Sequence, residues 1–345
     1  MMKIEYLNPV SAPHWNAEIG TFPEANIFHT DAWAKTLMEA YQYEPQYAVW
    51  YEGGSPQVVA PFMEVKSVLT GKRGVSLPFT DLCPILTKGP IPTSEVIKDL
   101  YDHGRARKWK TLETRGLIKA PENNEKVPTF YIHELDLLPG EELLFAQIRS
   151  STRRNIRKSE KQGVHVVTDN STYGLAEFCR LNMITRRDHG LPPQPKRFFD
   201  SLFRNVIEPG FGRILLAIYN GQCIASAVFL QFNGHAIYKY GASDKKYQAL
   251  RANNLLMWEA IRIFSNEGAR TFHFGRTEPE NAGLLQFKRG WGAVEGPLVY
   301  GKYNFKSEKW VINSASASGL HTKLFSRMPL FALRFVGKIL YRHMG

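Results

Sequence analysis

Residues 213–241 read RILLAIYNGQCIASAVFLQFNGHAIYKYG, and this stretch decides the fold of the second half of the chain. Three apolar runs, 213–219, 222–232 and 235–241, are joined by Asn220-Gly221 and Asn233-Gly234. Asn-Gly between apolar runs is a strong hairpin signal, because both residues tolerate the positive φ of a type I′ turn. The sequence therefore predicts a three-stranded antiparallel meander.

The segments around the meander predict helices and further strands. Residues 255–267 have helical apolar spacing, with Asn253 or Asn254 as N-cap and Gly268 past the end, and 271–275 follows as a strand. The first half shows the same order of helix, antiparallel strands, helix and strand, at residues 31–41, 46–51, 56–61, 65–69, 74–77, 94–108 and 111–115. We therefore expect an α/β fold with mixed sheets, in which two domains share one architecture.

The boundaries between these parts follow from composition. The polar segment 119–127 predicts a loop, 129–138 a last strand of the first domain, and 141–161 one long helix that opens the second. We expect an N-terminal domain over residues 1–138, a C-terminal domain over 139–308 and a tail over 309–345.

Composition and charge narrow the classes of function. The chain has 345 residues, 43% hydrophobic and 22% charged, which is typical of folded domains, and its net charge of +12 favours anionic partners. The three cysteines are isolated, so neither disulfides nor a metal site are expected. Residues 1–15 lack the apolar core of a signal peptide, and no run of 18 apolar residues occurs. We expect a cytoplasmic protein that does not span a membrane.

A polar cluster follows the predicted strand 271–275. Arg276, Glu278 and Glu280 come directly after it, and Lys288 lies on a short predicted helix. Ligands of α/β proteins often bind at strand ends, so these residues are candidates for holding a substrate. The alternative is an ordinary polar loop, with Phe287 and Trp291 in the core and Lys288 in solvent.

Several motifs resemble those of FemAB-related proteins, which include peptidoglycan-bridge aminoacyltransferases and exopolysaccharide-associated FemAB-like proteins. They are Tyr-Gly-Ala-Ser at 240–243, the helix start at 253–261, Phe-Gly-Arg-Thr at 274–277 and Phe-Lys-Arg-Gly-Trp-Gly at 287–292, with 13–48 and 71–81 in the first half. The resemblance implies two GNAT-like domains in tandem. It also implies an acyltransferase or aminoacyltransferase that forms an amide on a peptidoglycan, lipid-linked or exopolysaccharide precursor.

The same resemblance implies roles for individual residues. Lys288, in the Phe-Lys motif, would lie near the transferred group, and an arginine after a threonine would bind the acceptor phosphates. That arginine is Arg187 or Arg186, because Thr185 stands one residue closer than the spacing in the family. The substrate-binding prediction also includes Arg276, Glu280, Tyr240, Asn254, Arg154 and Arg157.

The chemistry of amide formation suits these residue types. A neutral amine attacks an ester or thioester carbonyl, and a lysine ammonium or backbone N–H groups can stabilise the oxyanion that forms. Asp188, His189 or Glu280 are candidates to accept the proton, and the predicted catalytic set is Lys288, Asp188 and His189. A lone histidine is more often structural, and the substrate itself can supply the base.

Two basic segments are further candidates for binding. Cations at 149–161 would form one side of an amphipathic helix suited to the phosphates of a nucleotide, a pyrophosphate lipid or tRNA, or else a solvated face. Residues 309–345 hold six basic and no acidic residues among bulky apolar ones, which favours a helix on an anionic membrane surface over one docked on the domain. Pro329 would break or start this helix.

The prediction of the acyl donor rests on the absence of a glycine-rich pyrophosphate-binding turn. Acetyl-CoA-dependent enzymes of the GNAT type hold the pyrophosphate with a glycine-rich turn before the helix that follows the meander, but residues 248–254 contain no glycine. We therefore expect aminoacyl-tRNA or acyl-CoA as the donor, with no prosthetic group, and an anionic or lipid-linked acceptor rather than DNA. The competing functions are a CoA-dependent N-acetyltransferase and a non-catalytic membrane-surface or RNA-binding protein.

Overall fold

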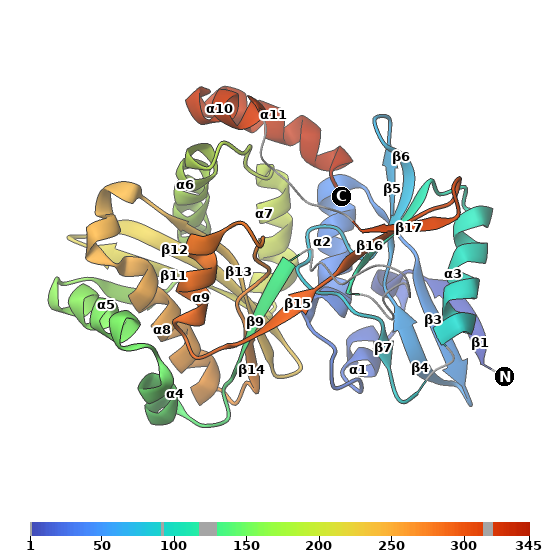
Figure 1. Cartoon of the computed structure of the whole chain (residues 1–345), viewed down its shortest axis with the longest axis horizontal. Helices are drawn as coiled ribbons and strands as arrows, with labels where there is room; N and C mark the ends of the chain where they lie inside the picture. The colour runs from blue at the N-terminus through green and yellow to red at the C-terminus, as the bar shows by residue number, and fades with distance from the viewer. Residues whose placement is uncertain (1, 91–92, 117–129, 313–319) are drawn as a thin grey trace. The chain divides into compact units, whose positions relative to one another are not determined.

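The computed structural model describes residues 2–90, 93–116, 130–312 and 320–345, and the predicted loop at 119–127 lies outside them (Figure 1). The chain forms two compact units. The first unit comprises Met1–Tyr131, Pro297–Ala315 and Leu340–Gly345, and the second comprises Ile132–Gly296 and Ser316–Ile339. The predicted domains 1–138, 139–308 and 309–345 stay a proposal, and the compact units differ from them because chain segments after residue 296 return to the first unit.

The first unit contains two sheets. A four-stranded antiparallel sheet has the order β1 (Lys3–Leu7), β3 (Tyr47–Glu52), β4 (Ser55–Ala60) and β7 (Leu86–Thr87). A six-stranded sheet has the order β17 (Lys309–Ile312), β16 (Tyr300–Asn304), β8 (Thr111–Arg115), β6 (Gly71–Val75), β5 (Met63–Ser67) and β2 (Glu44–Pro45). Among the described residues of this mixed sheet, β6 and β8 run parallel to each other. The α-helices of the first unit are α1 (Trp15–Ile19), α2 (Asp31–Tyr41) and α3 (Thr93–Ala106) in its described residues.

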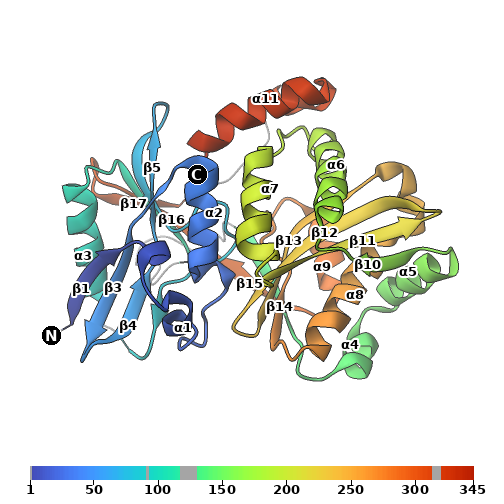
Figure 2. The same cartoon turned by 180° about the vertical axis from the view of Figure 1, so that it is seen from behind.

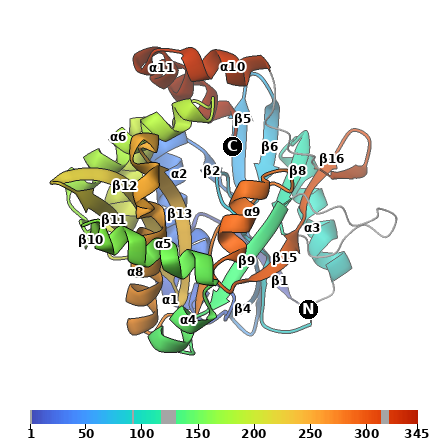
Figure 3. The same ribbon diagram turned by 60° about the vertical axis from the view of Figure 1, so that its left-hand side comes forward.

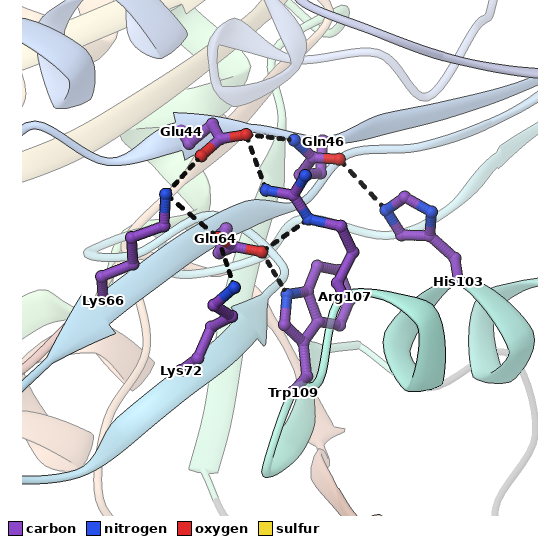
Figure 4. Close-up of polar contacts among 8 residues, drawn as sticks. All are labelled: Glu44, Gln46, Glu64, Lys66, Lys72, His103, Arg107 and Trp109. Carbon is purple, nitrogen blue, oxygen red and sulfur yellow. Dashed lines mark hydrogen bonds and ion pairs between the residues drawn. The ribbon is translucent and has the colours of Figure 1, made fainter.

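A buried carboxylate ties three strands of the first unit to the end of α3 (Figure 4). Glu64 on β5 accepts hydrogen bonds from Arg107 Nε at 2.8 Å and from Trp109 Nε1 at 2.7 Å. Lys66 and Lys72 form ion pairs with its other oxygen at 3.4 Å and 3.6 Å. Arg107 also binds Glu44 on β2 at 2.6 Å. The four side chains that contact this carboxylate all present donor groups to it. Its charge is therefore compensated although the Glu64 side chain is fully buried.

The second unit is built on a seven-stranded mixed sheet. Its order is β10 (His165–Thr168), β11 (Gly212–Tyr219), β12 (Gln222–Phe232), β13 (His235–Ser243), β14 (Thr271–His273), β9 (Phe130–Asp136) and β15 (Val294–Leu298). The predicted meander is confirmed as β11–β13. Asn220 and Gly221 have φ of 47° and 74°, and Asn233 and Gly234 have φ of 50° and 77°, as type I′ turns require.

Helices pack on both faces of this sheet. The helices are α4 (Glu141–Gln147), α5 (Ser150–Lys161), α6 (Thr172–Asp188), α7 (Lys196–Leu202), which continues as a π-helical turn at Phe203–Ile207, α8 (Ala252–Asn266) and α9 (Ala282–Arg289). Alternate strand residues such as Leu215, Ala227 and Phe229 pack with Leu255 and Phe264 of α8 in one core. The helices α6 and α7 lie on the opposite face, seen from behind in Figure 2. Mixed α/β architecture with mixed sheets is thus confirmed.

Three sequence predictions need correction here. The expected helix at 141–161 breaks into α4 and α5, because Ile148 turns inward in an extended conformation and Arg149 donates its N–H to the carbonyl of Gly290 at 3.0 Å. The strand expected to close the first domain, β9, instead pairs with β14 in the sheet of the second unit. The tail expected from residue 309 begins as strand β17, paired with β16.

The rest of the tail is helical, as expected. It forms α10 (Leu320–Arg327) and α11 (Leu330–Leu340), separated at Pro329, and ends in a short turn at Tyr341–His343. Leu333 and Gly337 of α11 are buried, whereas Phe331 and Phe335 are 77% and 65% exposed. The amphipathic character is confirmed, and α11 presents an exposed aromatic stripe.

Candidate active site

The exit of β14 and the start of α9 form the first candidate group. The Phe274 N–H donates to the carbonyl of His133 on β9 at 2.9 Å, and Gly275 then turns the chain away with φ of 73°. Asn281 caps α9 by accepting a hydrogen bond from Leu284 N at 3.1 Å. The turn and the cap together direct α9 back toward the strand end (Figure 3).

Lys288 on α9 is buried, with only 2% of its surface exposed. Its Nζ donates to the carbonyls of Gly275 at 2.7 Å and Arg276 at 3.2 Å. The alternative in which Lys288 lies in solvent is therefore wrong, whereas Trp291 is fully buried, as that alternative expected. A buried ammonium needs such acceptors, because an unpaired charge inside a protein is costly. The structure thus brings Lys288 to the backbone of Arg276.

A histidine beside Lys288 was not identified from the sequence. His133 is fully buried and its Nε2 lies 2.8 Å from Glu295 Oε2, while Arg289 forms a two-pronged ion pair with Glu295 at 2.7 Å. Burial and the nearby Lys288 lower the pKa of His133, and the Arg289 hydrogen bond lowers the pKa of Glu295. No spacing in the sequence links His133 to Glu295, since they meet only through neighbouring strands β9 and β15.

A second group meets at Ser243, where β13 ends. Thr185 Oγ1 of α6 accepts a hydrogen bond from Ser243 N at 3.0 Å and lies 3.1 Å from its carbonyl oxygen. Asn253 Nδ2 of α8 donates to Ser243 Oγ at 3.2 Å. The end of α6, the start of α8 and the end of β13 are therefore fixed to one another. The predicted residues on α6 and α8 lie around this junction.

The residues that follow Thr185 differ in how they are held. Arg186 Nε donates to the carbonyl of Pro192 at 3.2 Å, and Asp188 lies 3.5 Å from Lys245. The Arg187 side chain makes no hydrogen bond or ion pair within the described parts of the chain, and it is half-buried. His189 follows the last residue of α6, and the partial burial of its ring, with Lys245 and Arg186 nearby, lowers its pKa.

The other predicted residues occupy different surroundings. Tyr240 on β13 packs among aromatic rings, with Phe199 at 5.7 Å and Lys239 Nζ 5.1 Å from the centre of its ring. Asn254 is buried in the first turn of α8, and Glu280 is exposed in the loop before α9.

The basic side of α5 is confirmed. Ile156 is buried against α8, while Arg154 and Arg157 are exposed. The Arg157 guanidinium lies 5.6 Å from the centre of the Phe145 ring, which orients it along α4. Arg149, at the N-cap of α5, contacts Gly290 after α9, so this basic helix begins next to the Lys288 segment.

The described residues contain neither a cluster of metal ligands nor a helix that could span a membrane. Among them no three His, Cys, Asp or Glu side chains gather as metal ligands. No helix in residues 2–90, 93–116, 130–312 or 320–345 is long and apolar enough to cross a membrane.

Comparison with known proteins identifies relatives of both the sequence and the fold. The family described as acetyltransferase (GNAT) domain matches residues 146–289. The lipid II:glycine glycyltransferase of Staphylococcus haemolyticus (strain JCSC1435) is 32% identical over 79 residues, which cover 21% of this chain and 19% of that protein. The same enzyme of Staphylococcus epidermidis (strain ATCC 12228) is 35% identical over 74 residues, or 19% and 18% of the two chains. The chain thus spans about a fifth of these relatives.

Solved structures agree with the predicted tandem fold. The crystal structure of FemX matches with a TM-score of 0.66 at 13% identity, over 86% of this chain and 95% of that one. A tandem GNAT protein from the clavulanic acid biosynthesis pathway matches with a TM-score of 0.53 at 13% identity, over 88% and 99%. The prediction of two GNAT-like domains is confirmed.

Proposed function

We propose that this chain, which belongs to the FemAB-related proteins of the GNAT-like superfamily, is an acyltransferase or aminoacyltransferase that forms an amide on a cell-envelope precursor. The observation that carries the proposal is the burial of Lys288 against the carbonyls of Gly275 and Arg276. A charged lysine is retained in a protein interior only where its neighbours compensate it, and such groups are concentrated in functional sites. The names of the relatives support a glycyl or similar acyl group and a lipid-linked acceptor.

Lys288 supplies positive charge for the transition state in this proposal. When the acceptor amine attacks the donor carbonyl, the carbonyl oxygen gains negative charge and the amine must lose a proton. A fixed ammonium near that oxygen stabilises the oxyanion by about 3 kcal/mol, or roughly 100-fold in rate. The carbonyls of Gly275 and Arg276 hold the ammonium in place before the reaction, so no reorganisation is needed when the charge develops.

Arg187 is our candidate for binding the anionic acceptor. The neighbouring Arg186 is held by the carbonyl of Pro192, whereas Arg187 makes no hydrogen bond or ion pair to the described residues. A guanidinium without a protein partner is suited to a phosphate, which it binds through two parallel hydrogen bonds. Of the two arginines left open by the sequence, we therefore assign the phosphate to Arg187.

His189 is our candidate for the general base. Its lowered pKa keeps the imidazole neutral near pH 7, and a neutral imidazole can accept the proton of the attacking amine. Asp188 instead forms an ion pair with Lys245 at 3.5 Å, which occupies its carboxylate. Glu280, Tyr240 and Asn254 remain proposed substrate contacts.

The donor is proposed to be aminoacyl-tRNA, with acyl-CoA as the alternative. Exposed Arg154 and Arg157 on α5 favour a polyanionic donor, because α5 begins beside the Lys288 segment. One observation favours CoA: Arg251, directly before α8, has φ of 60°, so the backbone already adopts the left-handed turn that glycine usually supplies. Titration calorimetry with acetyl-CoA separates the two, since tight binding would contradict the tRNA donor.

A peripheral position on an anionic membrane is also proposed, through α11. Its exposed Phe331 and Phe335 lie four residues apart and share one helical face, with exposed Arg334 and Lys338 between and beside them. This combination is typical of helices that lie in the lipid headgroup region. A lipid-linked precursor would be reached most readily from that position, whether the product belongs to peptidoglycan or to an exopolysaccharide.

The transferase activity is tested with Lys288→Ala and Lys288→Met. Mass spectrometry of envelope precursors from cells with and without the gene first identifies the modified amine. Purified variants are then assayed on that precursor, and both should lose roughly 100-fold or more in kcat. Lys196→Ala is the matched control, because Lys196 is exposed and forms its ion pair with Asp200 of its own helix. Full activity of folded Lys288→Met would overturn the proposed role of the ammonium, and unchanged precursors would overturn the function.

A further inference from the structure

The turn between β5 and β6 displays two apolar side chains to solvent. Val68 and Leu69 are 92% and 68% exposed, at the tip of a hairpin in which Ser67 pairs with Gly71. The hairpin projects beyond the rest of the first unit in both Figure 1 and Figure 2. Exposed apolar residues at a projecting tip are costly in water unless another phase or partner covers them.

The turn is held in one conformation. Ser67 Oγ accepts hydrogen bonds from the N–H groups of Leu69 and Thr70, each at 3.1 Å. His343 Nδ1 lies 3.1 Å from the same oxygen, so the end of the chain is fixed beside the hairpin. Gly71 has φ of 80° and closes the turn. Val68 and Leu69 are therefore held in an exposed conformation before any binding occurs, and little conformational entropy is lost when they become covered.

Cations surround the tip. Lys66 and Lys72 lie directly across the hairpin from each other, with 61% and 36% of their side chains exposed, whereas Arg73 is buried and pairs with Glu113 at 3.2 Å. Both lysines pair with Glu64, and Lys66 also pairs with Glu44 at 2.7 Å, but their partly exposed side chains can still approach the phosphates of an anionic surface. Exposed Lys110 packs over Gly71 and adds a further cation.

The neighbouring end of the chain has the same character. The Tyr43 hydroxyl donates to the carbonyls of Tyr341 and Arg342, each at 3.1 Å, and Arg73 donates to the carbonyl of His343 at 3.0 Å. Arg342 and Met344 are exposed on this fixed segment. It thus extends the surface around the tip with one more apolar and one more cationic side chain.

We propose that the β5–β6 tip inserts Val68 and Leu69 into the headgroup region of an anionic lipid bilayer, with the surrounding cations on the lipid phosphates. Two apolar side chains are too few for a stable protein interface, which takes about 800 Å² from each partner. They suit a bilayer, where a short apolar insertion and electrostatic attraction add to each other. This contact belongs to the first unit and is independent of α11 and of the transferase reaction.

Vesicle flotation tests the binding. The full chain carries Phe331→Ser and Phe335→Ser in α11, so that binding through α11 does not hide binding through the tip. It is mixed with vesicles of phosphatidylcholine alone or of phosphatidylcholine with phosphatidylglycerol. Adding Val68→Ser and Leu69→Ser should weaken partition to the anionic vesicles by about tenfold, since two inserted side chains are lost. The matched control, Leu138→Ser with Leu143→Ser, removes two exposed apolar residues among acidic neighbours and should change nothing. Equal flotation of the tip variant would overturn the proposal.

A probe at the tip separates insertion from indirect effects. An environment-sensitive fluorophore on Leu69→Cys, with Cys179→Ser to remove the half-buried thiol, should shift to the blue with anionic vesicles only. The same probe on Leu143→Cys should not shift. An unshifted probe at residue 69 on floating protein overturns the insertion, and a tip variant that changes the oligomeric state assigns the tip to a protein contact instead. Neither result depends on whether the chain is a transferase.

Discussion

Replacing Glu64 by alanine should destabilise the first unit by about 3 kcal/mol, because it removes the common acceptor of buried Trp109 and of the partly exposed Arg107 and Lys72. Trp109 Nε1 would lose its partner in the interior, and Lys72 would lose its ion pair. Arg107 keeps Glu44 at 2.6 Å and is partly exposed, so the loss should fall at the lower end of the range for a broken buried pair. Glu64→Gln keeps the shape and one acceptor oxygen, and about half that loss is expected.

The stability of this network should depend on pH in a defined direction. Burial alone would raise the pKa of Glu64, but hydrogen bonds from Arg107 and Trp109 hold this pKa below the ordinary value of 4.5. The folded state therefore binds this proton less readily than the unfolded state. The contribution is fully present above the unfolded pKa and is lost as the pH falls through the lower folded pKa. The free energy of unfolding should therefore fall more steeply below about pH 4.5 in the native chain than in Glu64→Gln.

Urea and thermal unfolding of the full chain measure both effects. A loss of about 3 kcal/mol lowers the midpoint of a unit of this size by roughly 6–12 °C. Glu5→Gln is the control, because Glu5 pairs with Lys3 on the exposed edge strand β1 and should change stability little. If Glu64→Ala unfolds with the native midpoint, or if Glu64→Gln keeps the native pH profile, the network does not stabilise the fold as described.

Two further predictions concern the second unit. Arg187→Ala should raise KM for the anionic acceptor tenfold or more with little change in stability, whereas Arg186→Ala should mainly lower stability because it frees the carbonyl of Pro192. Steady-state kinetics and thermal unfolding of both variants measure these effects, and the opposite pattern would reverse the assignment. Gly337→Ala should detach α11, because the new Cβ atom would lie 2.2 Å from the backbone oxygen of Pro193. Proteolysis between residues 320 and 340 should become faster, and unchanged cleavage would contradict this packing.

Local signals explain what the sequence predicted well. The Asn-Gly pairs specify both turns of the meander without help from distant residues. Pro329 separates α10 from α11 because its ring fixes φ and removes the backbone N–H. Pairing between distant strands has no such signal. The sequence of β9 is that of an ordinary strand, and only its partner β14, more than 130 residues later, decides which sheet it joins.

The candidate site divides in the same way. Lys288 can be predicted because it stands in a recognisable motif, but its burial depends on how α9 folds back over Gly275. His133 and Glu295 were missed because they are 162 residues apart and meet only across the sheet. The choice between Arg186 and Arg187 needed the carbonyl of Pro192, which lies beyond the end of α6.

The return of β16 to pair with β8 has a consequence for biosynthesis. The first 131 residues leave the ribosome long before residues 300–304, so β8 keeps an open edge until most of the polypeptide has been made. During that interval the nascent chain presents a template for aberrant strand addition, and chaperone protection would matter most then. Separate expression of residues 1–138 would make the same exposed edge permanent and should yield insoluble material.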